Sequence, residues 1–131
     1  MTPAPHVHAR VVLQDASTET QRQRAIVDYL RRCVTPWVFH VPNGGLRDPR
    51  VAAKLKADGV LPGVPDIGVV LPGGKILWIE VKAPGGRLSE AQIAFRDHIM
   101  ATGGLWCLAY DIDGVERALA SYGIASRGKA A

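Results

Sequence analysis

Two carboxylates and one ammonium group stand at a spacing that suits hydrolysis assisted by a metal ion. Asp66 follows Pro65, and further along the chain Glu80 and Lys82 are separated by the single residue Val81. Carboxylate oxygens bind hard divalent cations such as Mg²⁺ or Mn²⁺, and the backbone carbonyl of Val81 is a further candidate ligand. A bound cation acidifies water and neutralises charge on a phosphodiester. Beside it, Lys82 could orient or deprotonate the attacking water or hold the phosphate.

A β-hairpin has to bring these groups together. Residues 67–71 and 76–82 are apolar segments, and the Pro-Gly-Gly-Lys between them predicts a turn. The second segment is apolar on both faces until its end, which is typical of a strand covered on both sides. Side chains alternate along a strand, so Glu80 and Lys82 share one face. Asp66 joins that face only when the numbers of paired residues sum to an even value, for instance with Asp66 opposite Glu80. We therefore expect an odd loop or a bulge rather than a two-residue turn.

The segments around this hairpin predict helices and further strands. Thr18 with Gln21, and Ser89 with Gln92, fit the capping box at the start of a helix. The other expected elements are a strand at 37–41, a short basic helix at 49–57, a strand at 105–110 and a helix at 113–122. This order predicts an α/β domain with a mixed sheet of about four strands flanked by helices.

The length and composition of the chain fit one compact domain with a polyanionic partner. The chain has 131 residues and a net charge of +4, and its pI is about 9.4. We expect a flexible lead-in over residues 1–16, the folded domain over 17–124 and a disordered basic tail over 125–131. The apolar runs are too short for a membrane span, and the N-terminus lacks the apolar core of a signal peptide. The sequence therefore favours a soluble, cytoplasmic protein.

The motif pattern resembles the PD-(D/E)XK nuclease superfamily and, within it, the VRR-NUC family. The matching segments are Glu19 near the start of the first helix, Asn43-Gly44, Gly63-Val64-Pro65-Asp66, Glu80-Val81-Lys82 and Ser89-Glu90-Ala91-Gln92. The resemblance covers about residues 17–110 and implies a restriction-endonuclease-like fold. It also implies a divalent-metal phosphodiesterase acting on DNA, with Glu19 as a further metal or water-linked ligand and Gln92 reaching the site. Small stand-alone members resemble Holliday-junction resolvases and are expected to act as homodimers.

Several of these residues also have ordinary structural explanations. Glu19 could favour the dipole of its helix, Gln92 could serve only as the capping partner of Ser89, and Asn43 could be a turn residue. Four basic residues on loops or the short helix could hold DNA phosphates together with Asn43 without reading sequence: these are Arg47, Lys54, Lys56 and Arg87. A solvated face is the alternative for each of them.

Three functions remain open at this point. The leading hypothesis is a structure-specific endonuclease that cuts branched DNA such as Holliday junctions, where the two-fold symmetry of a homodimer matches that of the junction. The second is an end-processing or restriction-type nuclease on linear duplex, and the third is a catalytically silent DNA-binding module. The sequence leaves the host process open among repair, recombination and phage genome processing.

Overall fold

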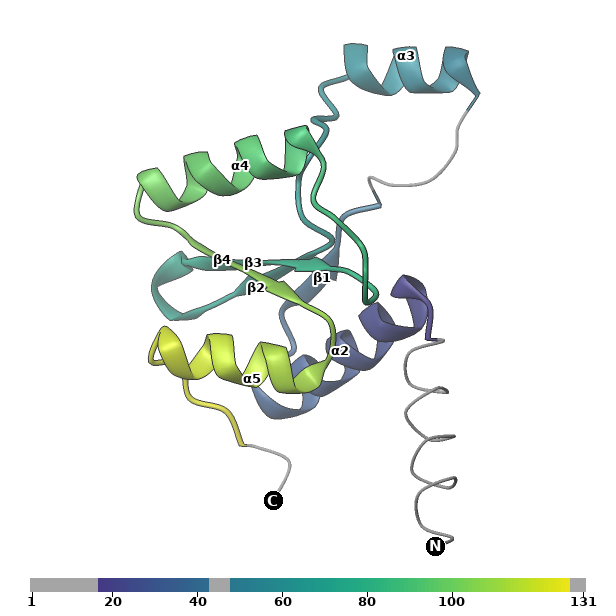
Figure 1. The fold of residues 1–131 in the computed structure, drawn as a ribbon. Coiled ribbons are helices and arrows are strands. Elements are labelled where there is room, and N and C mark those ends of the chain that lie inside the picture. The colour runs from purple at the N-terminus through teal and green to yellow at the C-terminus, as the bar shows by residue number, and fades with distance from the viewer. Residues whose placement is uncertain (1–16, 43–47, 128–131) are drawn as a thin grey trace, which may run out of the picture.

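The computed structural model describes residues 17–42 and 48–127. In chain order the elements are α2 (Glu19–Cys33), β1 (Val38–His40), α3 (Pro49–Ala57), β2 (Ile67–Val70), a 3-10 turn (Pro72–Gly74), β3 (Ile76–Val81), α4 (Glu90–Ala101), β4 (Leu105–Ala109) and α5 (Ile112–Ser121) (Figure 1). The expected lead-in over residues 1–16 lies outside the described residues. The domain boundaries therefore stay a prediction.

The strands form one mixed sheet in the order β1-β2-β3-β4. The pairs β1-β2 and β2-β3 are antiparallel, and β3-β4 is parallel. Helix α4 lies on one face of the sheet, and α2 and α5 lie on the other (Figure 1). The predicted α/β architecture is confirmed.

The core lies between the sheet and the pair α2 and α5. Its most deeply buried side chains are Ile26, Tyr29, Leu30, Ile67, Val69, Leu77, Ile79, Val81, Val115 and Leu119. Side chains of this kind each stabilise the fold by about 1.5–3 kcal/mol when fully buried. The face toward α4 is covered more thinly, because no residue of α4 is fully buried.

The register of the hairpin agrees with the requirement set by the motif. Ile67 pairs with Ile79, so one further step places Asp66 opposite Glu80. The connection is odd in length, since Val70 pairs with Ile76. Positive φ angles at the two glycines, 81° and 78°, form this turn, as expected where only glycine is free of strain.

Both predicted capping boxes are present. The Thr18 hydroxyl accepts from the Gln21 amide at 3.1 Å, and the Gln21 side chain accepts from the Thr18 amide at 2.8 Å. The pair Ser89 and Gln92 repeats the same two distances. Helix α5 begins one residue earlier than predicted, because the carboxylate of Asp111 caps it by accepting from the Gly114 amide.

Helix α3 stands away from the sheet (Figure 1). None of its residues is buried. Its bounds agree with the short basic helix expected at 49–57. Asp48 caps it by accepting from the Arg50 amide at 2.7 Å, and the helix ends before Gly59. Of the helices in residues 17–42 and 48–127, none is both long and apolar enough to cross a membrane.

Candidate active site

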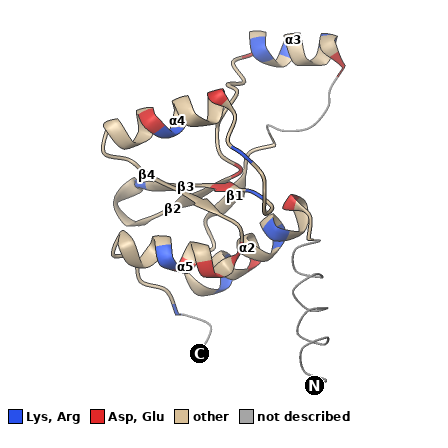
Figure 2. Ribbon diagram, viewed as in Figure 1, with Lys and Arg blue, Asp and Glu red and all other residues tan. Residues whose placement is uncertain are grey.

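The predicted acidic and basic side chains meet where β3 ends. Asp66 immediately precedes β2, and Glu80 is the second-last residue of β3. Lys82 follows β3 directly and points to the same face as Glu80. Figure 2 shows acidic and basic segments next to each other at this end of β3. The structure thus brings together the three residues that the motif singled out.

The backbone and side chain of Asp66 are both held in place. Its backbone carbonyl accepts from the Val41 amide at 2.8 Å and contacts Nδ1 of His40 at 2.8 Å. A carbonyl only accepts, so His40 donates here when Nδ1 carries the proton. The Asp66 carboxylate accepts from the Val81 amide at 2.8 Å. This fixes its direction beside Glu80.

Pro65 affects the backbone hydrogen bonding beside the site. Continuing the β2-β3 register by one more pair places Pro65 opposite Val81. Proline has no N–H, so it cannot donate to the Val81 carbonyl as another residue would in an antiparallel ladder. Residue 65 therefore leaves that carbonyl oxygen available to another group. This supports its candidacy as a ligand.

Glu80 is the most unusual side chain of the site, because it is a carboxyl group only 2% exposed. Its Oε2 accepts from the side-chain amide (Nε2) of Gln92 at 3.2 Å, whereas its buried Oε1 has no partner among the described residues. Burial raises the pKa of Glu80 from 4.5 to about 9, and a hydrogen bond and charge from Asp66 add to the rise. The Lys82 ammonium opposes this rise, and the charge of Glu19 adds to it.

The donor set fits a hard divalent cation. The oxygen donors are the adjacent carboxylates of Asp66 and Glu80 and the Val81 carbonyl, and the buried Oε1 of Glu80 has no other partner among the described residues. Mg²⁺ is commonly bound through one or two carboxylates and keeps several waters. Within the described ranges, no group of three or more His, Cys, Asp or Glu side chains is placed to hold a metal, so Asp66 and Glu80 stand as a pair without a third such side chain in place.

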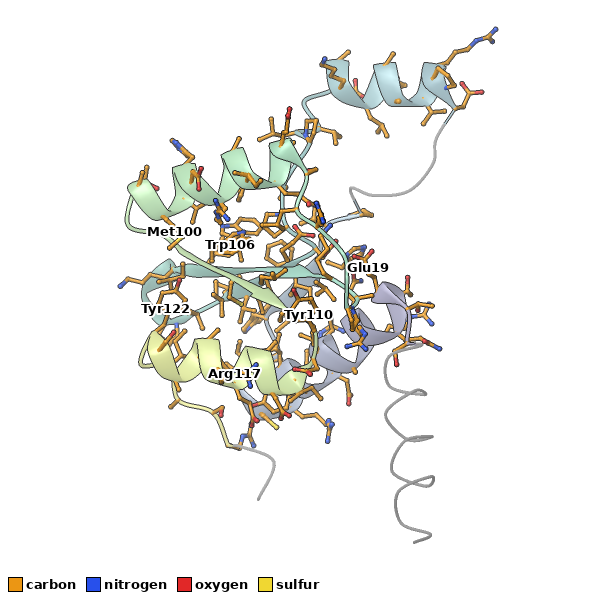
Figure 3. All side chains as sticks on the ribbon, in the orientation of Figure 1. Glu19, Met100, Trp106, Tyr110, Arg117 and Tyr122 are labelled. Atoms are coloured by element: carbon orange, nitrogen blue, oxygen red, sulfur yellow. The ribbon has the colours of Figure 1, made fainter. Side chains whose placement is uncertain are left out.

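Gln92 and Glu19 both approach this centre. The Gln92 side chain both caps α4 and donates a hydrogen bond to Glu80, so it contacts the site, while its role in catalysis stays a prediction. Glu19 is exposed rather than turned into the core, because α2 begins beyond the end of the sheet (Figure 1). It nevertheless lies close enough to affect the pKa of Glu80, and Figure 3 labels it beside that end of the sheet.

The predicted phosphate-binding residues are spread around the site. Lys54 forms an ion pair with Asp58 at 2.7 Å within α3. Lys56 is exposed on the same helix, and Arg87 is exposed on the loop between β3 and α4. Asn43 and Arg47 lie outside the described residues.

Two hollows lie near the site without including Asp66 or Glu80 in their lining. The larger of these two, about 730 Å³, is lined by Ser17, Gln21, Arg22, Ala25, Pro84, Gly85, Tyr110, Asp111, Ile112 and Asp113. The smaller one, about 420 Å³, lies between α3 and the start of α4, and both Lys56 and Gln92 line it.

Sequence reasoning missed the contact of His40 with Asp66. No local signal could have revealed it, since the two residues are far apart in the chain and meet only through the β1-β2 pairing. The motif singled out Pro65, but its relation to the Val81 carbonyl depends on the same kind of pairing.

The comparisons with known proteins agree with this fold. One similar solved structure is described as a VRR_NUC domain protein; it has a TM-score of 0.66 and 24% sequence identity, covering 82% of this chain and 88% of that chain. A likeness at this identity shows a common fold. No relative matches among the curated proteins. The model of the VRR-NUC domain matches residues 9–110, which is most of the chain, and the chain therefore belongs to the VRR-NUC family of nucleases.

Proposed function

We propose that this chain is a divalent-metal-dependent endodeoxyribonuclease that hydrolyses phosphodiester bonds in branched DNA such as Holliday junctions. One observation carries the proposal more than any other: the buried Oε1 of Glu80 has no partner among the described residues and lies beside a second carboxylate. A buried, ionised carboxylate is costly unless it is paired or binds a cation. Such a pair is therefore better suited to holding a metal than to stabilising the fold.

Each residue of the site has a role in this proposal. Asp66, Glu80 and the Val81 carbonyl would hold Mg²⁺ or Mn²⁺, with Glu19 as a further or water-linked ligand. When bound, the cation supplies charge neutralisation on the phosphate and acidifies water. Gln92 would keep the Glu80 carboxylate in one orientation, as partners of ligating carboxylates commonly do.

Lys82 would act on the substrate directly. Its ammonium group, on the same face as Glu80, would hold a non-bridging phosphate oxygen and orient the attacking water. The water oxygen would bond to phosphorus while one phosphorus–oxygen ester bond breaks. The attacking water would release one proton to solvent, and the departing oxygen would take one up from solvent. Charge is thereby offset at the positions where it develops.

The DNA would lie along the open surface between α3 and the loop after β3. Lys56 and Arg87 are exposed there and would contact phosphates together with Lys54. Asn43 and Arg47, outside the described residues, would also bind DNA. A homodimer would place two sites on the two strands of a symmetric junction. Light scattering of the purified protein tests this assembly.

The decisive experiment is cleavage of a four-way junction, a flap and a linear duplex with Mg²⁺ or Mn²⁺. Asp66→Asn, Glu80→Gln and Lys82→Ala should each lower the rate by about 100-fold or more. Arg117→Ala is a control, since Arg117 is an exposed basic residue on α5, which covers the opposite face of the sheet (Figure 1). It should cut like the wild type.

The possible outcomes separate the candidate functions. Equal cutting of all three substrates would contradict the preference for branched DNA and favour a nuclease of linear duplex. A folded protein that binds DNA but cuts none of the substrates with either metal would indicate a silent binding module. Wild-type rates in Asp66→Asn and Lys82→Ala would show that the site is elsewhere.

A further inference from the structure

The sheet face that carries the carboxylates is only partly covered by a helix. α4 packs over β3 and β4, with Phe95 edge-on to Trp78 at 5.6 Å between ring centroids and Arg96 over the ring of Trp106. Over β1 and β2, three apolar side chains stay open to solvent. We call them the aromatic shelf: they are Trp37, 72% exposed, Phe39, 37% exposed, and Val70, 38% exposed.

The aromatic shelf leads directly to the candidate active site. Trp37 and Phe39 flank the buried Val38, so they share the face opposite the core. Phe39 pairs with Gly68, two residues from Asp66 on the same face. At the rise of a strand, this spacing is roughly 7 Å. An unpaired nucleotide lying on the shelf would therefore be next to the carboxylates.

Gly68 determines the orientation of the Phe39 ring. A Cβ atom at residue 68 would overlap that ring, so the ring lies across β2 in the space that the glycine leaves. The centroids of the Phe39 and Trp78 rings are 6.1 Å apart, with an interplanar angle of 86°. One ring is thus held against the sheet, while Trp37 beside it is mostly exposed.

The edge of β1 is closed to an added strand. The outward carbonyl of Val38 accepts from the guanidinium of Arg31 at 2.8 Å, and the amide of Val38 donates to the Pro36 carbonyl at 2.9 Å. A second chain cannot extend the sheet here without breaking both bonds. A molecule that binds the shelf must therefore contact the faces of the Trp37 and Phe39 rings rather than the strand edge.

The charges around the shelf favour an anionic occupant. Residues 31–42 and 67–79 contain no Asp or Glu. Arg31 lies along the strand edge, and Lys75 is exposed near the Val70 end of the shelf. Exposed aromatic rings bordered by cations are the arrangement that binds single-stranded nucleic acid, with bases on the rings and phosphates on the cations.

We propose that the aromatic shelf stacks unpaired nucleotides next to the scissile phosphate, and that Trp37 thereby selects DNA with an unpaired segment. A paired base hides its faces within the duplex, so a fully paired substrate gains nothing from these rings. The proposal rests on the proposed nuclease function for its link to cleavage. Binding to the shelf does not depend on catalysis.

The first test compares two substitutions of Trp37 on two substrates that share the same duplex. One substrate has an unpaired arm and the other is fully paired. Trp37→Leu keeps an apolar side chain but removes the ring, and should lower kcat/KM on the armed substrate by about tenfold, the effect of losing one stacked base. It should leave the paired substrate unchanged. Trp37→Phe should retain most of the wild-type rate on both.

The second test needs no cleavage. A short oligothymidylate is added to the protein in EDTA, and tryptophan fluorescence is recorded. The wild type should be quenched on binding, because Trp37 is the most exposed of its tryptophans. Trp37→Phe should lose the quench, since Trp78 and Trp106 lie beneath α4. An equal quench in that variant would overturn the proposal.

The outcomes distinguish the shelf from the nuclease. Quenching through Trp37 in a protein that cuts nothing would support the shelf and reject the proposed function. Normal cleavage of the armed substrate by Trp37→Leu would reject the shelf and leave the function intact. If Trp37→Leu changes the oligomeric state and slows cleavage of both substrates equally, the shelf is a contact between copies and the proposal is wrong.

Discussion

At the scale of single residues, the contact of Asp66 with Glu80 is the central feature. Two neighbouring carboxyl groups, one of them buried, cannot both be ionised without cost. The pKa of Glu80 is raised to about 9 by burial first and by Asp66 second. Without a cation, Glu80 therefore stays protonated near neutral pH, and a cation would replace that proton.

The stability of the metal-free protein should fall as pH rises. The unfolded chain releases the Glu80 proton near its ordinary pKa of 4.5, whereas the folded chain holds it up to about 9. The stabilisation is thus fully present below about pH 4.5 and is lost as pH rises through about 9. Thermal unfolding in EDTA across this range measures the effect.

Glu80→Gln is the control for this pH dependence. The amide cannot titrate, so the melting temperature of the variant should vary less with pH than that of the wild type. Mg²⁺ should raise the melting temperature of the wild type more at high pH, where less proton must be displaced. If the melting temperature of the wild type in EDTA instead rose between about pH 4.5 and 9, the raised pKa of Glu80 would be contradicted.

Gln92 should matter for activity beyond its capping role. Gln92→Ala removes the amide that donates to Glu80, and loss of such a partner typically lowers metal affinity or activity by about 10–100-fold. Gln21→Ala is a matched control, because it removes the same capping contact in α2. Both should lose about 0.3–1.5 kcal/mol of stability. Equal activity in the two variants would show that Gln92 only caps α4 and does not support the site.

At the scale of elements, the loop before β2 is positioned by close contact with α4. Gly63 has φ +90°, and a Cβ atom there would overlap the backbone carbonyl of Ala91. The contact brings the loop that leads to Asp66 against the helix that carries Gln92. Two parts of the site are thereby set relative to each other by one residue without a side chain.

Gly63→Ala should therefore disturb both stability and activity. Gly59→Ala is its control, since Gly59 has φ +104° with open space around it and should show only the strain of a positive φ, about 1–2 kcal/mol. Gly63→Ala should cost about 1–3 kcal/mol more through overlap with the backbone. It should also slow cleavage, which chemical denaturation and kinetics would measure together. Equal stability of the two variants would contradict the proposed close packing.

At the scale of the whole molecule, the free edges of the sheet are both capped by side chains. Arg31 binds the Val38 carbonyl at β1. At β4, the Tyr122 hydroxyl lies 2.8 Å from the carbonyl and 3.3 Å from the amide of Trp106. Assembly by strand pairing is disfavoured at both edges. Contacts with DNA or a second copy should therefore use side-chain surfaces, among them the basic helix α3 that stands away from the sheet (Figure 2).

The lysines of α3 should contribute unequally to DNA binding. Lys54 is paired with Asp58, whereas Lys56 has no acidic partner recorded in the described part of the chain. Lys56→Ala should reduce the slope of log affinity against log salt by about one, and Lys54→Ala by less. Arg32→Ala, which breaks a similar pair with Asp28 on α2, serves as the control. Fluorescence anisotropy with labelled DNA measures all three, and equal slopes would exclude α3 from the interface.

The sequence by itself determined the parts of the molecule that depend on neighbouring residues. The two capping boxes, the bounds of α3 and the odd turn of the hairpin follow from short-range spacing and strand alternation. The motif therefore also predicted that Asp66, Glu80 and Lys82 would share a face. The β1 strand spans Val38–His40 rather than the expected 37–41, although Trp37 and Val41 still bond to Val70 and Asp66 through the backbone.

Tertiary structure alone decided the environment of those groups. The unpartnered oxygen of Glu80 depends on how α4 closes over β3, and the hydrogen bond from Gln92 depends on the angle at which that helix enters. The position of Pro65 opposite Val81 and the exposure of Trp37 beside a covered Trp78 depend on strand pairing and on how far α4 extends. Burial and contact between segments distant in the chain are properties of the packed molecule, and no local pattern encodes them.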